Sequence, residues 1–459
     1  MDYILQYAVH GYALIVLLSM VLLCVGKYGR IMVWLISIAA TAAMAVFFLG
    51  NLIQVPHVLI SFSGVKNKFM WIVGTMSVMS IIMNGFNSNK QTGKCILIMI
   101  YLLFALILAG AGEFISFFIA IISLSIISDL ANCLGGDDKR YNAAIKSFIS
   151  SLMMMIFFIL AITFFYMSTG TFSIYEHVVK EESFYLISIS LVFLITCYYL
   201  GIFPLGICLP NLFNSVEKKN IFQNIIIVRL VIAYNLLMLL QRMIFECSPE
   251  MQKIILGGVT VVVLASAIIS SIIGINQQQN KKALAYFYMA HSSFILMIVN
   301  LVPEEVVERY TLFFMATQAI SFGGCAYLMQ DLCADGRIQD TANELSGSFY
   351  VNSYKSTLYV IFLLCILGLP FTAGFASKYY ITYTYFKEGF IVEMVIMLIA
   401  FLVMMAYILK MVMNIFTIIP EEIIMKKKTM VVNNFRSDGI MTLLALLMLI
   451  GGLTPYLLQ

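Results

Sequence analysis

The feature that most constrains this chain is a series of apolar segments, each long enough to cross a lipid bilayer, along nearly its whole length. Of its 459 residues, 62% are hydrophobic and 11% are charged, whereas soluble domains have about 25% charged residues. A spanning helix needs about 20 predominantly apolar residues. By that measure we predict fourteen spans, at 9–26, 31–54, 69–87, 95–111, 113–133, 145–167, 184–210, 220–241, 254–275, 283–302, 310–330, 356–386, 390–417 and 439–458. The predicted fold is an all-α polytopic membrane protein.

Composition also argues against several classes of site. The net charge is only +4 and no basic stripe is present, so we expect no nucleic-acid binding. The nine cysteines include no C-x-x-C pair, and the four histidines are scattered. We therefore expect no metal or iron–sulfur site on this chain, and any cofactor chemistry on other chains. No cleavable signal pattern precedes the first predicted span.

Lysine and arginine in the connections predict the orientation. The odd-numbered connections between spans hold sixteen of these residues, and the even-numbered ones hold six, or seven with Arg242. Because cytoplasmic loops are enriched in positive charge, the odd-numbered connections should face the cytoplasm. Both termini are then predicted to lie outside.

Two prolines indicate an internal repeat. Only Pro204 and Pro370 fall well inside predicted spans, in spans seven and twelve. If spans 4–8 and 9–13 are two five-helix units, each proline lies in the fourth helix of its unit, and the units have opposite orientation. Inverted repeats with broken helices are typical of secondary transporters. The predicted organisation is 1–94 for three N-terminal helices, 95–247 and 248–417 for two inverted repeats, and 418–459 for a loop and the final helix.

Lys378 is the strongest candidate for a functional residue. It follows a cluster of Gly368, Pro370 and Gly374, and no other charge occurs between Lys355 and Lys387. A lysine at membrane depth costs about 2.5–3.5 kcal/mol on insertion scales. Burial favours the neutral amine, so such a lysine can exchange a proton near neutral pH. We predict that Lys378 transfers protons beside a helix break.

Five further residues are candidates with open alternatives. Arg229 lies mid-span and is interpreted as a fixed charge, because arginine is a poor proton carrier; a structural ion pair is the alternative. His291 can relay protons or simply pack, and Lys281, near the cytoplasmic end of the same span, can link it to water or cap the membrane edge. Lys146 and Lys410 are weaker candidates, since either could reach an interface.

Four motifs together resemble a known family. The clearest is Leu-Gly-Leu-Pro-Phe-Thr-Ala-Gly-Phe-Ala-Ser-Lys-Tyr-Tyr at 367–380. The others are Ala-Ala-Ile-Lys-Ser-Phe at 143–148 with Thr-Gly-Thr at 169–171, Asn-Lys-Lys-Ala-Leu-Ala-Tyr at 280–286 followed by His291, and Tyr-Ile-Leu-Lys at 407–410. In order and spacing they resemble the antiporter-like membrane subunits of complex I, closest to subunit N of NADH-quinone oxidoreductase. The resemblance implies a proton-translocating subunit that binds no NADH, flavin, iron–sulfur cluster or quinone itself, in a hetero-oligomer with other membrane subunits.

The chain departs from this family at several positions, and the most consequential are one charged pair. The resemblance implies a mid-membrane glutamate in span five and a lysine in span seven, and the counterparts here are Ala120 and Tyr199. Glu113, two turns outward, is the acid that could substitute. Three hypotheses follow: a proton-pumping subunit of complex I, a subunit of a cation/proton antiporter or membrane hydrogenase, or a scaffold subunit of complex I that has lost pumping.

Overall fold

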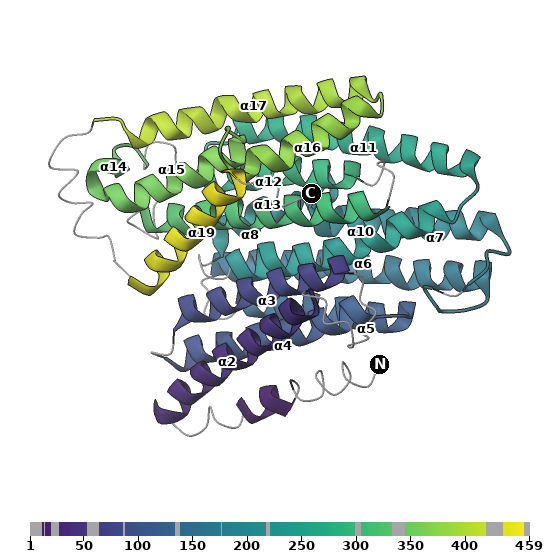
Figure 1. Ribbon diagram of the computed structural model, residues 1–459, viewed down its shortest axis with the longest axis horizontal. Helices are drawn as coiled ribbons and strands as arrows, with labels where there is room; N and C mark the ends of the chain where they lie inside the picture. The colour runs from purple at the N-terminus through teal and green to yellow at the C-terminus, as the bar shows by residue number, and fades with distance from the viewer. Residues whose placement is uncertain are drawn as a thin grey trace. The chain divides into compact units, whose positions relative to one another are not determined.

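The described part of this computed structural model is almost entirely helical (Figure 1). It covers residues 12, 14–19, 27–52, 64–85, 88–133, 138–175, 177–216, 221–298, 304–332, 345–418 and 435–453. The predicted first span, 9–26, lies largely outside these residues. The helices form two compact units. Unit 1 comprises the described residues of Met1–Ile195 with Gln223–Leu236, and unit 2 those of Thr196–Phe222 with Leu237–Gln459.

Unit 1 is built from long antiparallel neighbours. Its helices are α2 (Lys27–Leu52), α3 (Gly64–Asn84), α4 (Asn89–Gly110), α5 (Phe114–Cys133), α6 (Asp138–Thr169), most of α7 (Glu182–Leu200), and parts of the π-helix η3 (Ile221–Ile227) and α10 (Val228–Phe245). Helices α2 to α6 pack mainly on their neighbours in the chain, as short connections favour.

Unit 2 surrounds one nearly fully buried helix. Its helices are the 3₁₀ turn η2 (Leu205–Cys208), α8 (Leu209–Ser215), the rest of α10, α11 (Pro249–Ile275), α12 (Asn280–Met297), α13 (Glu304–Leu332), α14 (Ser348–Val351), α15 (Ser353–Leu367), α16 (Ala373–Lys387), α17 (Ile391–Ile415) and α19 (Phe435–Leu453). Helix α12 packs against α8, α11, α13 and α17. It therefore occupies the centre of the unit.

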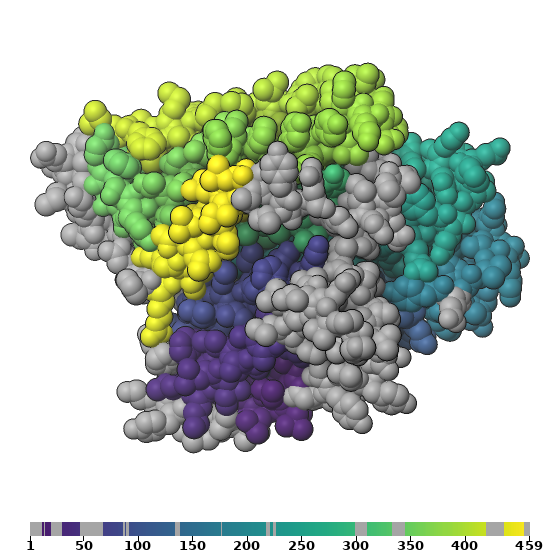
Figure 2. Space-filling model, viewed as in Figure 1, coloured from purple at the N-terminus to yellow at the C-terminus, as the bar shows by residue number. Residues whose placement is uncertain are grey.

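Apolar side chains lie on the outside as well as in the core. Among the described residues, nine helical stretches are long and apolar enough to cross a bilayer. Helix α17 lies at the surface in the space-filling view (Figure 2) and exposes Val392, Leu402 and Met413. Helix α6 likewise exposes apolar side chains. In water such surfaces would favour aggregation, so they are expected to face lipid or neighbouring subunits. The chain is a polytopic helical membrane protein; the total of fourteen spans stays a prediction.

The break predicted at Pro204 is confirmed. Helix α7 ends at Leu200, Gly201 adopts a left-handed φ of 80°, and the peptide between Phe203 and Pro204 is cis. The chain continues as η2 and then α8. A side chain on Gly206 would place its Cβ 2.3 Å from the Gly201 carbonyl oxygen, so the tight reversal requires glycine there.

The break predicted at Pro370 is confirmed as well. Helix α15 ends at Leu367, and Gly368 terminates it with a left-handed φ of 72°. Its amide donates to the carbonyls of Leu364 and Cys365, the usual way in which a glycine ends a helix. Helix α16 starts after Thr372, whose side chain accepts a hydrogen bond from the amide of Phe375. Predicted span twelve is therefore two half-helices, α15 and α16.

Candidate functional site

Lys378 extends back from α16 to the end of α15. Its side chain is buried, with 9% of its surface exposed. Its Nζ donates a hydrogen bond to the carbonyl oxygen of Ile366. It also lies 4.2 Å from the centroid of the Phe401 ring of α17, a cation–π arrangement that stabilises an ammonium group when water is excluded. The lysine thus has a defined pocket within unit 2.

The helix break creates the acceptor for this lysine. The last carbonyls of a helix have no partner within it, and the negative end of the helix dipole favours a cation there. Glycine allows the close approach. A Cβ on Gly368 would lie 2.9 Å from Lys378 Cδ, and one on Gly374 would lie 1.8 Å from the Cys365 carbonyl oxygen. The glycines of the motif therefore make room for the lysine and for the contact between the half-helices.

His291 meets Lys378 at the same oxygen. Its Nε2 lies 3.3 Å from the Ile366 carbonyl oxygen, and its ring is 5.6 Å from that of Phe401, centroid to centroid. The imidazole is 5% exposed. Its Nδ1 is buried and has no hydrogen-bond partner among the described residues. Two proton-exchanging groups predicted separately from the sequence are thus brought together within unit 2.

Buried polar contacts of α12 lie beside His291 and, separately, in the first turn of the helix. Gln318 of α13 donates to the hydroxyl of Ser292 at 2.8 Å, one residue after His291. At the start of α12, Tyr407 donates to the side chain of Asn280 at 3.1 Å. Lys281 and Lys282 stand in the same first turn and are partly exposed. At 1.5 Å per residue, His291 lies about 15 Å from this end of the helix.

At the first break, Gly201–Pro204, a glycine with a left-handed φ again separates two helical segments, but the partners of the break are uncharged. The amide of Phe203 donates to Ser266 Oγ of α11 at 2.9 Å, and Ser293 of α12 donates to the same hydroxyl at 3.0 Å. Tyr199, at the end of α7, is buried with 2% exposure. The two breaks therefore differ in chemistry: serine hydroxyls at one and a lysine at the other.

A family comparison identifies this architecture. Residues 111–406, more than half of the chain, match the model of the NADH:quinone oxidoreductase/Mrp antiporter transmembrane family. The chain belongs to this family. The matched segment includes α5, both helix breaks, His291 and Lys378, so the site lies in the part of the chain that defines membership.

Individual relatives agree with the family match. NADH-quinone oxidoreductase subunit N 1 of Solibacter usitatus is 24% identical over 60% of this chain and 57% of its own length. NADH-quinone oxidoreductase subunit N of Beutenbergia cavernae is matched over 53% of its length. The chain therefore spans only about half the length of each of these two relatives. A chain of respiratory complex I from Thermus thermophilus superposes with a TM-score of 0.78, at 16% identity and 98% coverage of both chains. A chain of the Mrp complex from Dietzia sp. has a TM-score of 0.78, at 12% identity and 99% and 95% coverage.

Arg229 lies in unit 1 and belongs to a buried polar cluster. The arginine is 8% exposed, and its Nη2 lies 3.5 Å from Ser147 Oγ of α6. That hydroxyl donates at 2.9 Å to Asp129 of α5. The predicted mid-span burial of Arg229 is confirmed. Asp129 and its two serine partners, Ser147 and Ser151, were not among the candidates predicted from the sequence.

The remaining predicted residues lie elsewhere. Lys146 of α6 and Lys410 of α17 have exposed side chains, which fits the alternative that they reach an interface. Glu113, which precedes α5, is also exposed, so it does not take the place of a buried family glutamate. Ala120, at that family position, is fully buried.

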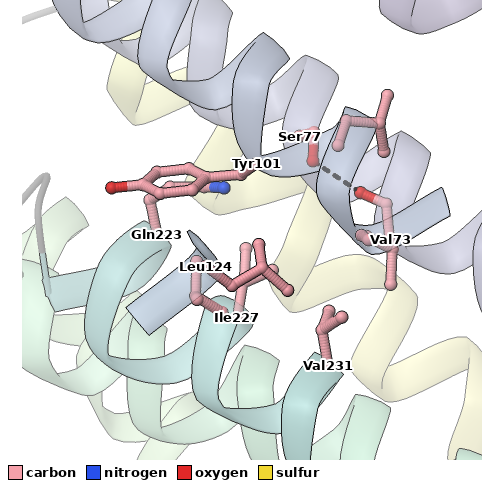
Figure 3. A pocket seen from close by; sticks show the side chains of 10 residues that line it. Val73, Ser77, Tyr101, Leu124, Gln223, Ile227 and Val231 are labelled. Carbon is pink, nitrogen blue, oxygen red and sulfur yellow. Dashed lines mark hydrogen bonds between the residues drawn. The ribbon is translucent and has the colours of Figure 1, made fainter. Parts of the chain in front are cut away.

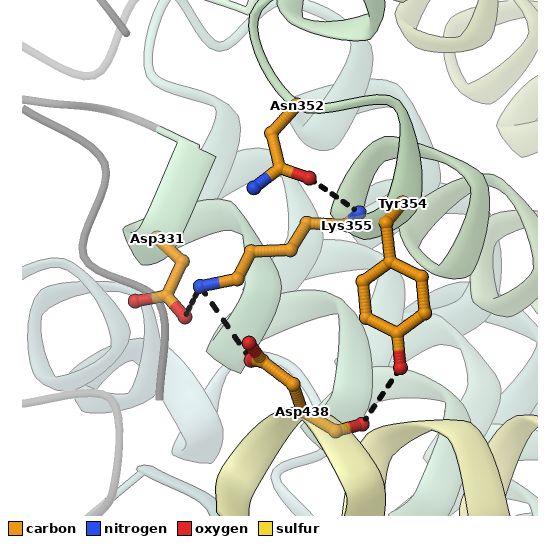
Figure 4. A network of polar contacts seen from close by, with 5 residues as sticks. All are labelled: Asp331, Asn352, Tyr354, Lys355 and Asp438. Atoms are coloured by element: carbon orange, nitrogen blue, oxygen red, sulfur yellow. Dashed lines mark hydrogen bonds and ion pairs between the residues drawn. The ribbon is translucent and has the colours of Figure 1, made fainter. Parts of the chain in front are cut away.

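Lys355 is one of the sixteen lysine and arginine residues that we assigned to the odd-numbered connections, and this assignment is wrong. The residue lies in α15, and its side chain is 1% exposed. Its Nζ is 3.1 Å from Asp331 of α13 and 3.5 Å from Asp438 of α19 (Figure 4). Tyr354 donates to the backbone carbonyl of Asp438. Hydropathy does not reveal this cluster, because its three charges lie at the ends of apolar segments and look like loop residues.

Proposed function

We propose that this chain is a proton-translocating membrane subunit of a respiratory NADH-quinone oxidoreductase, complex I, in a bacterial cytoplasmic membrane. The observation that supports this most directly is the meeting of Lys378 and His291 at the carbonyl of Ile366, between two half-helices. An ionisable residue inside a membrane segment is by default a functional one. The chain belongs to a family that includes quinone oxidoreductase and antiporter subunits, and this membership supports proton translocation as the reaction class.

In this proposal Lys378 holds and releases the proton. As an ammonium group it donates to the Ile366 oxygen and rests over Phe401. As a neutral amine it can accept a proton. His291 contacts the same oxygen, so the two ionisable side chains lie close together at the helix break. Lys281, in the first turn of α12, is the proposed link from His291 to water.

The finer architecture is part of the same proposal. We propose fourteen spans, with inverted five-helix repeats at 95–247 and 248–417, flanked by 1–94 and 418–459, and with both termini outside. The two helix breaks support it, because each falls at the fourth helix of its repeat. A proton site at a broken helix near the middle of the membrane is how secondary transporters are organised.

The proposal places the redox chemistry on other subunits. NADH, FMN, iron–sulfur clusters and quinone would be bound by other chains of the complex, and this chain would contact other membrane subunits and lipid. The exposed apolar faces of α6 and α17 support such contacts. The subunit composition of the purified complex tests this part directly.

A second candidate is a subunit of a cation/proton antiporter, or of a membrane hydrogenase. The likeness to a chain of the Mrp complex favours the first of these. Co-purification distinguishes them: flavin and iron–sulfur proteins accompany a complex I subunit, and only membrane proteins accompany an antiporter. A third candidate, a scaffold subunit without pumping, is favoured by Ala120 and Tyr199, because neutral buried residues stand where the family has a charged pair.

The test uses three lysine variants in the assembled complex. Lys378→Met removes the charge and the proton. Lys378→Arg keeps a charge that does not release its proton, because arginine stays protonated in proteins. Lys387→Met is the control, since Lys387 lies on the same helix α16 and is exposed. We expect both Lys378 variants to lower the proton-to-electron ratio in membrane vesicles and the control to leave it unchanged. A wild-type ratio and quinone reductase rate in both Lys378 variants would overturn the proposal.

A further inference from the structure

Unit 1 contains a second buried charged site, formed by Asp129, Ser147, Ser151 and Arg229. Asp129 is 7% exposed and accepts hydrogen bonds from both serines, at 2.9 Å from Ser147 and 3.0 Å from Ser151. The serines are four residues apart on α6, so they share one helix face and bind one carboxylate oxygen each. Buried carboxylates need such partners because an uncompensated charge in a low-dielectric interior is strongly unfavourable.

Ser147 links the acid to the arginine. Its Oγ donates to Asp129 and accepts from Arg229 Nη2 at 3.5 Å. One hydroxyl therefore separates a titratable group from a permanently charged one. Arginine does not release its proton, so any proton that this site gains or loses belongs to the carboxylate. The site has one mobile proton and one fixed positive charge.

Unit 1 also contains a small cavity with a mostly apolar lining. Tyr101, Ser77 and Gln223 are among its lining residues, with apolar side chains between them (Figure 3). The Tyr101 hydroxyl donates to the carbonyl oxygen of Ile127, two residues before Asp129.

Gln223 gives the cavity an unmet acceptor. Its side chain is 3% exposed, and its Oε1 is buried without a hydrogen-bond partner in the described part of the chain. It lies in the π-helix η3, which runs directly into α10 and Arg229. π-Helical turns are frequent at functional sites.

We infer that Asp129 is the proton-accepting group of unit 1, with Ser147 and Arg229 as positioning residues. The carboxylate takes a proton from hydronium, becomes a carboxylic acid and leaves water. Release is the reverse, and Arg229 keeps its charge throughout. This inference rests on the proposed function. It gives unit 1 an acid–base pair at a place different from the family positions held here by Ala120 and Tyr199.

The experiment compares acid variants in the intact complex. Asp129→Asn removes the proton site and keeps the shape, and Asp129→Glu keeps the acid. Glu113→Gln is the matched control, because Glu113 directly precedes α5 and is exposed. We expect Asp129→Asn to lower the proton-to-electron ratio of vesicles that reduce quinone, Asp129→Glu to recover at least half of the loss, and the control to keep the wild-type ratio.

Two outcomes separate this inference from the proposed function. If Lys378→Met lowers the ratio and Asp129→Asn leaves it at wild type in normally assembled complex, this inference fails and the proposed function stands. If neither changes it, both fail. Should Asp129→Asn prevent assembly, the double variant Ser147→Ala/Ser151→Ala tests the same site. A lowered ratio in assembled complex then supports the inference, and an unchanged one leaves Asp129 with a structural role only.

Discussion

Replacing Lys355 by methionine should destabilise unit 2 strongly. The lysine stands between Asp331 and Asp438, and the side-chain exposures of the three are 1%, 7% and 13%. Lys355→Met keeps most of the side-chain volume but leaves two carboxylates buried without their cation. Removing one partner of a buried ion pair costs about 3–5 kcal/mol, mainly because the remaining charge is uncompensated.

The protein contains a matched exposed pair. Arg242 and Glu246 are four residues apart at 3.4 Å, with side-chain exposures of 35% and 30%. An exposed helical pair of this kind contributes about 0.3–0.5 kcal/mol. Arg242→Met therefore also removes a positive charge but should hardly lower the free energy of unfolding. The expected loss of unfolding free energy is several times larger for Lys355→Met, which an unfolding measurement can resolve.

The assay is reversible unfolding of the purified protein in mild detergent as the mole fraction of SDS rises, followed by circular dichroism. We expect Lys355→Met to unfold at a clearly lower SDS fraction than Arg242→Met. A triple variant with Asp331→Asn and Asp438→Asn should recover part of the loss, because no net charge is then left buried. Equal midpoints for Lys355→Met and Arg242→Met would refute the argument from burial.

Two further predictions concern the helix breaks. Gly368→Ala should lower the free energy of unfolding by about 1–2 kcal/mol, because a left-handed φ of 72° disfavours alanine and the new Cβ meets Lys378. The control is Gly257→Ala, where the Cβ has open space. A similar unfolding midpoint for both variants would contradict the reasoning. Ser266→Ala should cost about 1–3 kcal/mol because it leaves the buried Phe203 amide without its acceptor. Ser270→Ala, which removes only a hydroxyl bonded within its own helix, should cost less, and the reverse order would show that the amide finds another partner.

Local patterns in the sequence were sufficient to predict both helix breaks and the position of Lys378 beside the second one. Pro204 and Pro370 interrupt apolar segments, and proline cannot donate the hydrogen bond that a continuous helix needs. Lys378 follows directly on the second interruption. These features lie within a few residues of one another, so their physical consequences can be read from the chain itself. Arg229 likewise had no route to an interface along a straight helix, and its burial was predictable.

The partners of these residues were decided only by the tertiary structure. His291 meets the Ile366 carbonyl across 75 positions of sequence, and Arg229 meets Ser147 across 82. No local pattern encodes such distances, because they depend on which helices pack together. Asp129 and Lys355 show the same limit: each lies near the end of an apolar segment, where a charge normally faces water, and only packing reveals that it is buried.

The sequence by itself determined that this is a helical membrane protein with two broken helices and a lysine beside the second. This follows because unpaired backbone polar groups and charged side chains are energetically costly in the hydrocarbon core, and this cost applies to each segment separately. The tertiary structure decided which charges are paired. It placed Asp129 beside Ser147 and near Arg229, and it brought Lys378 and His291 to the same carbonyl oxygen, because electrostatic partners are set by distances between helices rather than along them.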